Sequence, residues 1–343
     1  MRAAQIERAG VIEIVDRAEP TLTRDTVIVS PLYVGLCGSD VSYYRSGANG
    51  TFQIREPLTI GHEIVATVTS IGESAFGDLR IGDRVLVHPV WPSPLPGGRT
   101  VPTALAAEVP HFLGSASTWP HTHGGLTERL AVRGERLRRL PDDLPSTRAA
   151  LAEPLSVVLH ALDRLATGYE GARVLVCGAG PIGLLAAVAL RRRGVASVAL
   201  TDLHERPLAI GSTLGAEVGY LIGDARNPVP EESFDIAIEA TGVPASLDTA
   251  IRSLRPGATL IQLGMLAKGG ITADLAQVVV KELTVIGSHR FLGELDDAIA
   301  LLADAPECDV IVTDVLPLAQ IDEALRRAGD AAGSSKVLVA VGG

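Results

Sequence analysis

The chain has 343 residues, of which 47% are hydrophobic and 20% charged, as expected of a soluble enzyme with two domains. Its formal charge of −10 argues against nucleic acid or an anionic membrane surface as the main partner. The three cysteines, Cys37, Cys177 and Cys308, lie far apart and predict no disulfide framework, and the first residues lack the apolar run of a signal peptide. We therefore expect a cytoplasmic protein, since a reducing compartment keeps thiolates available as metal ligands.

The first part of the chain, residues 1 to about 150, is predicted to be rich in β-strands. Short apolar or β-branched runs at 27–29, 64–68 and 84–87 have glycines between or beside them, which is typical of strands joined by turns. Residues 91–125 are irregular, with repeated proline and glycine, and are unusually long for a connection. Such a loop is either functional or a remnant.

The middle of the chain, residues 152–288, alternates between strand and helix patterns. Expected strands cover 173–177, 197–201, 234–238, 258–262 and 283–286, and expected helices end near 190 and cover 205–214. Continuous apolar strands that alternate with helices predict a parallel sheet covered on both faces. The uncharged stretch 174–190 is broken by glycine and proline, so we assign it to a buried strand and helix and not to a membrane span.

The last part of the chain is expected to return to the first domain. Its pattern predicts helices at 295–303 and 319–328 and a closing strand at 336–339. The predicted organisation is one domain made of 1–151 and 289–343, and a second domain made of 152–288.

Three residues with side chains that zinc prefers lie in glycine-rich stretches: Cys37, His62 and Glu63. A thiolate, an imidazole and a carboxylate suit a zinc ion that keeps one coordination position open for substrate. Glu153 offers a further carboxylate. Taken singly, a cysteine is usually a small buried hydrophobe and a His-Glu pair usually lies on the surface. Their occurrence together is what favours a metal site.

A dinucleotide-binding pattern follows a predicted strand and opens a helix; it consists of Gly178, Gly180, Pro181, Ile182 and Gly183. Asp202, 19 residues beyond Gly183, ends the next strand, where it can accept hydrogen bonds from both ribose hydroxyls. The alternative for Asp202 is a solvated cap on the following helix. An acid at this point repels a 2′-phosphate, so we expect NAD rather than NADP, and Arg206 nearby softens that preference.

The metal motifs, Cys37-Gly38-Ser39-Asp40 and Gly61-His62-Glu63, resemble those of the medium-chain zinc-dependent alcohol dehydrogenases in order and spacing. The resemblance covers the whole chain. It implies an α/β protein with a GroES-like β-barrel catalytic domain and a Rossmann domain with a doubly wound parallel sheet. It also implies one catalytic zinc held by Cys37, His62 and Glu63, with Glu153 bound directly or through water.

The resemblance assigns roles to further residues. Ser39 matches the hydroxyl that passes the substrate proton towards the cofactor ribose, whereas Ser42 stands where many relatives keep a relay histidine. The residues implied to line the nicotinamide are Thr241, Gly242, Leu263, Gly264 and Met265. Those implied to line the substrate pocket, from a pattern that resembles the L-idonate 5-dehydrogenases of the polyol branch, are Tyr43, Phe52, Arg290 and Phe291. The alternative for Arg290 is an ordinary salt bridge between domains.

The long loop departs from the family pattern. Many relatives carry four closely spaced cysteines there, which hold a structural zinc, but this chain has no cysteine between Trp91 and Gly125. His111, His121 and His123 are the only soft ligands in that stretch. We therefore predict that the structural zinc is lost and that each chain holds one zinc ion.

The predicted function is a zinc- and NAD-dependent dehydrogenase that acts on a secondary alcohol of a sugar acid or polyol, as a homodimer or homotetramer. A sorbitol, other polyol or 2,3-diol dehydrogenase on the same scaffold is the alternative among enzymes. A non-catalytic NAD-binding sensor is the alternative in another class, but such a protein has no need of all five residues Cys37, Ser39, His62, Glu63 and Glu153.

Overall fold

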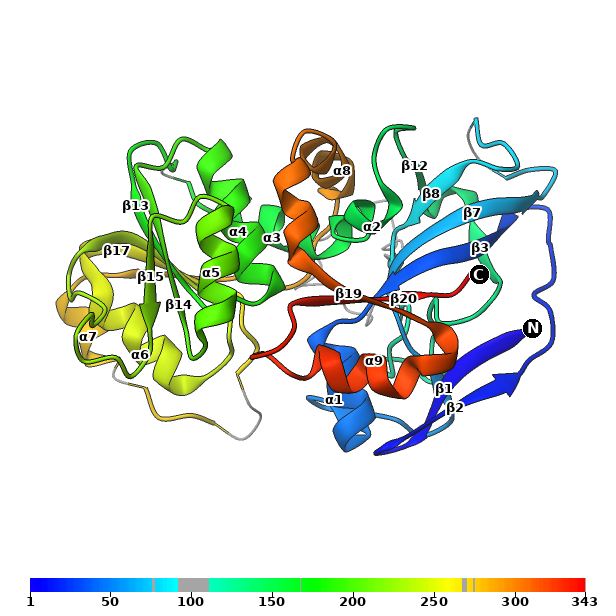
Figure 1. Cartoon of the computed structure of the whole chain (residues 1–343), viewed down its shortest axis with the longest axis horizontal. Helices are drawn as coiled ribbons and strands as arrows, with labels where there is room; N and C mark the ends of the chain where they lie inside the picture. The colour runs from blue at the N-terminus through cyan, green and yellow to red at the C-terminus, as the bar shows by residue number, and fades with distance from the viewer. Residues whose placement is uncertain (76–77, 92–110, 167, 267–269, 274, 343) are drawn as a thin grey trace, which may run out of the picture. The chain divides into compact units, whose positions relative to one another are not determined.

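The computed structural model describes the chain except for residues 76–77, 92–110, 167, 267–269, 274 and 343 (Figure 1). The chain divides into two compact units. Unit 1 contains residues 1–153, 295–330 and 336–343, and unit 2 contains residues 154–294 and 331–335. Each unit has its own sheet and its own candidate site, so each is described by itself.

The main sheet of unit 1 is mostly antiparallel and runs in the order β12-β8-β7-β3-β20-β19, with β11 also paired to β3. Its strands are β3 (Thr26–Gly35), β7 (Glu63–Ile71), β8 (Arg84–Val87), β11 (Leu130–Arg133), β12 (Leu137–Arg139), β19 (Val312–Pro317) and β20 (Lys336–Ala340). Strands predicted at 27–29, 64–68, 84–87 and 336–339 are confirmed. The segment β19, which pairs parallel to β20, was not predicted.

Smaller elements complete unit 1. Its other strands are β1 (Arg2–Arg8), β2 (Val11–Asp16), β4 (Ala48–Asn49), β5 (Phe52–Gln53), β6 (Leu58–Thr59), β9 (Val90–Trp91) and β10 (His111–Phe112). Its helices are α1 (Gly38–Ser46), α2 (Ser146–Ala149), α8 (Leu295–Ala303) and α9 (Ile321–Ala328). The structure confirms the helix predicted at 295–303, and α9 occupies most of the one predicted at 319–328.

The core of unit 1 follows from the alternation of its strands. In β3 the side chains of Val27 and Val29 point inward and are fully buried, and Ile64 and Ala66 do the same on β7. Burying each such valine or isoleucine stabilises the fold by about 1.5–3 kcal/mol. This packing fixes the register between β3 and β7, and that register positions the residues at the ends of both strands.

Unit 2 contains a six-stranded sheet in the order β15-β14-β13-β16-β17-β18, with all neighbours parallel. The strands are β13 (Arg173–Cys177), β14 (Ser197–Asp202), β15 (Val218–Leu221), β16 (Phe234–Glu239), β17 (Leu254–Gln262) and β18 (Thr284–Gly287). The predicted parallel sheet is therefore confirmed. Since the chain starts at β13 in the middle and winds outward in both directions, the sheet reverses its strand order between β13 and β16.

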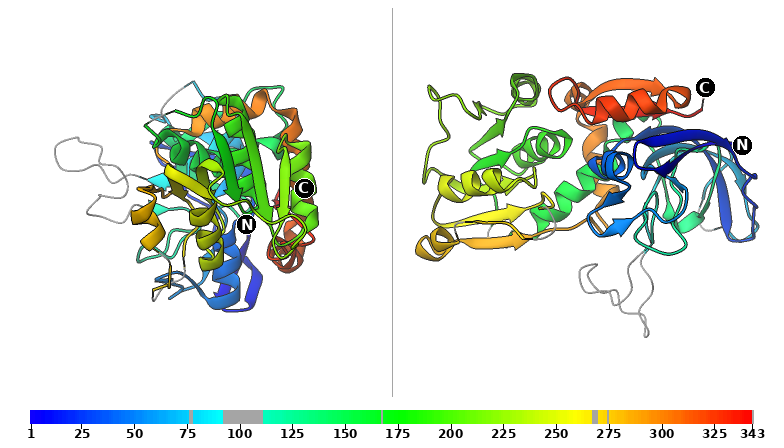
Figure 2. Two further views of the ribbon diagram at one scale, coloured as in Figure 1. Left: turned by 90° about the vertical axis from the view of Figure 1, so that its left-hand side faces the viewer. Right: turned by 90° about the horizontal axis from the view of Figure 1, so that it is seen from below.

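Helices cover both faces of this sheet, as Figure 1 and the left-hand view of Figure 2 show. The helices of unit 2 are α3 (Ala152–Asp163, which begins at the end of unit 1), α4 (Pro181–Arg192), α5 (Glu205–Thr213), α6 (Pro244–Ser253) and α7 (Ala276–Val280). Helices α4 and α5 contact β13, β14 and β15, whereas α6 contacts β13, β16 and β17. Right-handed crossovers, the rule for parallel strands, put these two groups on opposite faces. Among the described residues, no helix is both long and apolar enough to cross a membrane. The stretch 174–190 is the buried strand β13 followed by α4, as predicted.

Candidate metal and dinucleotide sites

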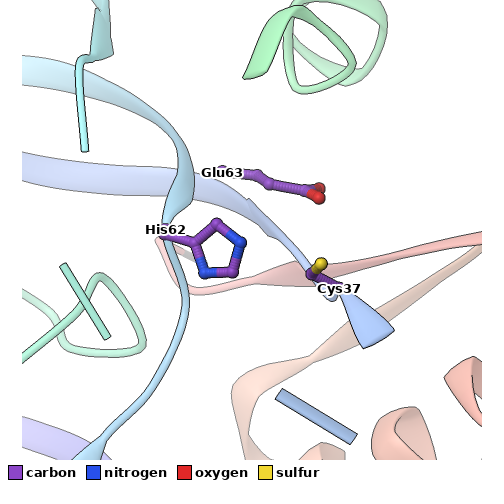
Figure 3. A group of neighbouring side chains, drawn as sticks. All are labelled: Cys37, His62 and Glu63. Carbon is purple, nitrogen blue, oxygen red and sulfur yellow. The ribbon is translucent and has the colours of Figure 1, made fainter. Parts of the chain in front are cut away.

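The strand register of unit 1 brings the three predicted metal ligands together. Gly35 at the end of β3 pairs with Glu63 at the start of β7, so the turn that carries Cys37 lies beside His62 and Glu63. One ligand atom of each of these three side chains lies within 4.8 Å of the other two. Figure 3 shows the His62 ring and the Glu63 carboxylate directed towards the Cys37 sulfur. Two of the three side chains are buried, and Cys37 is half-buried.

Glu153 lies close to this cluster without being part of it. It sits in the first turn of α3 and is only 5% exposed. Burial raises the pKa of Glu153 to about 7, with His62 lowering it and Glu63 raising it. The charges of His62 and Glu63 therefore both act on the Glu153 carboxyl group.

Asp40 also belongs to the site, although its motif predicted no role for it. Its carboxylate is fully buried and accepts hydrogen bonds from the backbone N–H of Cys37, at 3.0 Å, and of Gly61, at 3.2 Å. One carboxylate oxygen lies 3.9 Å from Nδ1 of His62. Asp40 thus joins the two ligand-bearing turns. Its place three residues after Cys37, in the first turn of α1, is the signal that could have identified it.

The cluster has the charge and donor atoms expected of a cation site. Burial lowers the pKa of His62, but Asp40 and the Cys37 thiol outweigh it and raise the pKa to about 10. Such a raised value means that the surrounding groups strongly favour positive charge at this point. Nδ1 of His62 is buried and has no hydrogen-bond partner among the described residues. A thiolate, an imidazole and a carboxylate in this field fit a zinc ion.

Lys336 is the second residue that the sequence did not reveal. Its Nζ lies 2.7 and 2.8 Å from the two carboxylate oxygens of Glu63 and donates to the carbonyl oxygen of Leu36 at 3.2 Å. Lys336 is on β20 and Glu63 on β7, the two strands that flank β3. Gly35 on β3 leaves room for this contact, because a Cβ there would lie 1.9 Å from Oε2 of Glu63.

Both Ser39, the predicted relay hydroxyl, and Ser42, which stands where many relatives keep a relay histidine, lie in α1. Ser39 is half-buried in the first turn, two residues after Cys37. The Ser42 hydroxyl donates to the carbonyl oxygen of Ala48 at 2.8 Å, so its proton is engaged in a hydrogen bond to the segment that follows α1. A relay through position 42 therefore has no support in this arrangement.

The residues predicted for the substrate pocket are divided between the units. Tyr43 is 1% exposed, and its hydroxyl accepts the backbone N–H of Ala116 at 3.0 Å. Phe52 is half-buried and packs against the core of unit 1. In unit 2, Phe291 is fully buried, and Arg290 has a left-handed backbone with φ of 58°. That conformation is uncommon outside glycine and often accompanies a functional position.

The glycine turn of unit 2 has the geometry that a dinucleotide requires. Gly178, after β13, has φ of 100°, and a Cβ on Gly183 would lie 1.8 Å from the carbonyl oxygen of Gly178. Gly180 has nothing within 4 Å of its would-be Cβ, which leaves open space at the start of α4. Pro181 and Ile182 begin that helix, whose free N–H groups suit a pyrophosphate.

Asp202 is at the end of β14, next to this turn. One oxygen of its carboxylate accepts the N–H of Ala179 at 2.9 Å, and the other accepts the N–H of His204 at 3.0 Å. Each oxygen keeps a further lone pair for a ribose hydroxyl. Arg206 is exposed in the first turn of α5. The turn and the acid together fit a dinucleotide.

The residues predicted at the nicotinamide lie in the turns that follow β16 and β17. A Cβ on Gly242 would lie 2.4 Å from the carbonyl oxygen of Met265, and a Cβ on Gly264 would lie 2.1 Å from the backbone nitrogen of Gly242. The two turns are therefore in contact. The backbone N–H of Thr241 donates to the Glu239 carboxylate, and the backbone N–H of Leu263 donates to the Glu239 carbonyl oxygen. The sequence did not single out Glu239.

The three histidines of the long loop form hydrogen bonds to other residues of unit 1. His121 accepts the backbone N–H of Arg55 at 2.9 Å, and His123 accepts that of Thr59 at 3.2 Å. Nδ1 of His111 shares a hydrogen bond with the Thr122 hydroxyl. Residues 92–110, which include most of the loop, lie outside the described residues, so the loss of the structural zinc stays a prediction.

Both halves of the chain match known sequence families. Residues 23–142 match the alcohol dehydrogenase GroES-like domain, and residues 146–340 match the C-terminus of glucose dehydrogenase. The chain is 31% identical to L-idonate 5-dehydrogenase (NAD(P)(+)) of Escherichia coli, over 88% of each sequence. This chain belongs to the medium-chain zinc-dependent alcohol dehydrogenase family. The predicted pairing of a GroES-like domain with a Rossmann domain is therefore confirmed.

Further relatives place the chain in the polyol branch of that family. It is 29% identical to sorbitol dehydrogenase of Bacillus subtilis, over 96% of this chain and 93% of the relative. The crystal structure of L-idonate 5-dehydrogenase from Escherichia coli superposes with a TM-score of 0.86 at 27% identity, over 99% of this chain and 98% of that one. The structure of 2R,3R-butanediol dehydrogenase from Bacillus subtilis gives 0.85 at 26%, over 99% of both chains.

Proposed function

We propose that this polyol-branch dehydrogenase uses zinc and NAD to oxidise a secondary alcohol of a sugar acid or polyol. The observation that carries the proposal is the cluster of half-buried Cys37 with buried His62 and Glu63, whose ligand atoms lie within 4.8 Å of one another. A merely structural zinc site is usually closed by four protein ligands, whereas three ligands leave a position for substrate. The glycine turn and Asp202 of unit 2 supply the matching cofactor site.

The residues divide the reaction between them. When bound, zinc supplies a Lewis acid that favours loss of the proton from the alcohol oxygen. Cys37, His62 and Glu63 hold the metal, and Glu153 is either a further ligand or holds a water beside it. Ser39, two residues beyond Cys37, accepts the proton of the alcohol and passes it on. Ser39 would donate its own proton towards the cofactor ribose as it accepts that of the alcohol, and because the Ser42 hydroxyl donates to the carbonyl oxygen of Ala48, water would continue the path beyond the ribose.

The proposed cofactor is NAD. Asp202 accepts from the ribose hydroxyls and repels a 2′-phosphate. Arg206 is exposed on α5 and weakens this discrimination. The turns at Thr241–Gly242 and Leu263–Met265 line the nicotinamide.

A sugar acid is the preferred substrate class. A metal held by a thiolate and a carboxylate carries little net charge, and the Lys336 ammonium on Glu63 offsets the Glu153 carboxylate, so the cluster offers a substrate carboxylate no excess positive charge and a further cation is required. The Arg290 guanidinium is permanently charged and can bind a carboxylate through two hydrogen bonds. Its left-handed backbone conformation is of the kind that often accompanies functional residues. A neutral polyol such as sorbitol, or a 2,3-diol, is the alternative.

Self-association is also part of the proposal. Strand β18 ends the parallel sheet of unit 2 and has no partner on its outer side among the described residues. Val285 on this strand is 51% exposed, and Val279 and Val280 on α7 are each 76% exposed. An uncharged edge beside exposed valines suits a second copy of the chain, so we propose a homodimer or a homotetramer. The cytoplasm is its proposed location.

The deciding experiment combines metal analysis with a substrate panel. The purified chain is loaded with zinc, dialysed and assayed for NADH formation on aldonates, polyols and 2,3-diols. We expect zinc to be retained and aldonates to be oxidised. A chain that keeps zinc and binds NADH but oxidises none of these substrates would instead support the sensor function.

A further inference from the structure

Glu239, the last residue of β16, is a fully buried carboxylate that the mechanism does not use. It occupies the centre of the carboxyl edge of the sheet, in register with Cys177 on β13 and Gln262 on β17. A carboxylate in such a place is stable only if its oxygens accept several hydrogen bonds.

The donors to Glu239 come from two separate turns. From the turn after β16 and the start of α6, they are the backbone N–H of Thr241 at 2.8 Å, the backbone N–H of Gly242 at 3.0 Å, the Thr241 hydroxyl and the Ser246 hydroxyl at 2.9 Å. From the end of β17, Nε2 of Gln262 donates at 2.6 Å. One side chain therefore fixes both turns.

Of these two turns, the one after β16 also contacts the glycine turn after β13. A Cβ on Gly178 would lie 2.6 Å from the Thr241 methyl group, and a Cβ on Gly264 would lie 2.5 Å from Oε2 of Glu239. Three turns therefore meet where the strand order reverses. A dinucleotide crosses a doubly wound sheet at this point.

The strand order decides which half of the cofactor the two turns face. The glycine turn takes the pyrophosphate, and Asp202 on β14 takes the ribose of the adenosine half. Strand β14 lies on one side of β13, and β16 and β17 lie on the other. The nicotinamide half must then extend over β16 and β17.

We infer that Glu239 is a positioning residue for the nicotinamide half of the cofactor. It acts through the turns at Thr241–Gly242 and Gln262–Met265 and does not touch the adenosine half. The inference rests on the proposed use of NAD.

The test is Glu239→Gln, which keeps the shape of the side chain but turns an amide NH2 towards N–H donors. The affinities of the zinc-loaded protein for NADH and for AMP are measured by titration. We expect the affinity for NADH to fall roughly tenfold or more, because buried donors lose their acceptor, and the affinity for AMP to stay within about twofold. General loosening of the fold would weaken both ligands.

Glu217→Gln is the matched control. Glu217 also accepts a backbone N–H, that of Val198 near the start of β14, but it is far along the strand from the three turns. This variant should leave both affinities unchanged. If Glu239→Gln does not fold, Gln262→Met removes one donor only and should show the same selective loss of NADH.

Two results would overturn the inference: equal weakening of NADH and AMP, or no weakening of either. A wild-type chain that binds neither ligand would instead overturn the proposed use of NAD. The two failures are therefore distinguishable.

Discussion

Lys336 and Glu63 form a buried ion pair across Gly35, with Nζ 2.7 and 2.8 Å from the two carboxylate oxygens. The two residues are 273 positions apart in the chain. Both side chains are almost fully buried, at 3% and 1% exposure. The pair therefore connects β20, the last strand of the chain, to a residue of the candidate metal site.

Replacing Lys336 by Met should destabilise the metal-free protein by about 3–5 kcal/mol, because it leaves the Glu63 carboxylate buried without its cation. Urea unfolding of the metal-free variant measures this loss. Added zinc should restore part of the stability, since the metal supplies the missing positive charge. Lys336→Arg, which keeps the charge, is the control and should lose less. Equal stability of wild type and Lys336→Met would show that the pair contributes nothing.

Replacing Cys37 by Ala should remove zinc and abolish turnover while NADH binding persists. Cys37 is in unit 1, whereas the glycine turn and Asp202 are in unit 2. Elemental analysis of the wild type should give about one zinc per chain, and the variant close to none. Cys308→Ala, at a buried cysteine outside the cluster, is the matched control. Two zinc ions per wild-type chain would contradict the predicted loss of the structural site.

Asp202 can be tested with two substitutions that separate its charge from its contact with the glycine turn. Asp202→Asn keeps an oxygen that can accept the N–H of Ala179 but removes the negative charge. It should improve kcat/KM for NADP relative to NAD without disordering the turn. Asp202→Ala removes both features and should also weaken NAD use. A wild-type enzyme that prefers NADP would rule out the proposed role of this acid.

His123 should make the free energy of unfolding of unit 1 depend on pH. Burial, with the charge of Arg17, lowers the pKa of His123 from 6.5 to about 4. The unfolded chain then binds the proton more readily than the folded chain, so this contribution is complete above about pH 6.5 and is lost as the pH falls towards 4. Protonation would also remove the acceptor for the backbone N–H of Thr59.

His123→Asn is the variant that isolates this effect, since the amide oxygen replaces Nδ1 as acceptor but does not titrate in this range. The melting temperature of the wild type should fall more steeply than that of the variant between pH 6.5 and 4. Parallel curves for the two proteins would assign the acid sensitivity to other groups.

Arg290→Met should separate the two classes of substrate. An aldonate whose carboxylate is held by Arg290 should lose on the order of 2–5 kcal/mol of binding, as truncated buried charge pairs do. A neutral polyol should lose less. The measurement is KM and kcat on one aldonate and one polyol. If the wild type ignores aldonates, or both substrates suffer equally, the sugar-acid proposal fails in favour of a neutral polyol.

The sequence by itself determined many of the strands and helices and the types of side chain in the candidate metal site. The strand at 173–177 and the helix at 295–303 were predicted at the bounds that the structure shows, because apolar periodicity is a local property. Cys37, His62 and Glu63 were predicted as a metal site from their side-chain types and from the resemblance of their motifs to those of the medium-chain dehydrogenases, and the structure brings the three side chains together. Strand β19 was missed because its burial does not alternate clearly.

Only the tertiary structure decided which distant residues support the site. The order β7-β3-β20 brings Lys336 to Glu63, and the close turns at the edge of unit 2 make Glu239 their common acceptor. No local pattern specifies which strands become neighbours, because pairing depends on how all buried faces pack together. Short motifs therefore predicted the side-chain types of the candidate site, whereas the order of the strands decided which distant charged residues contact it.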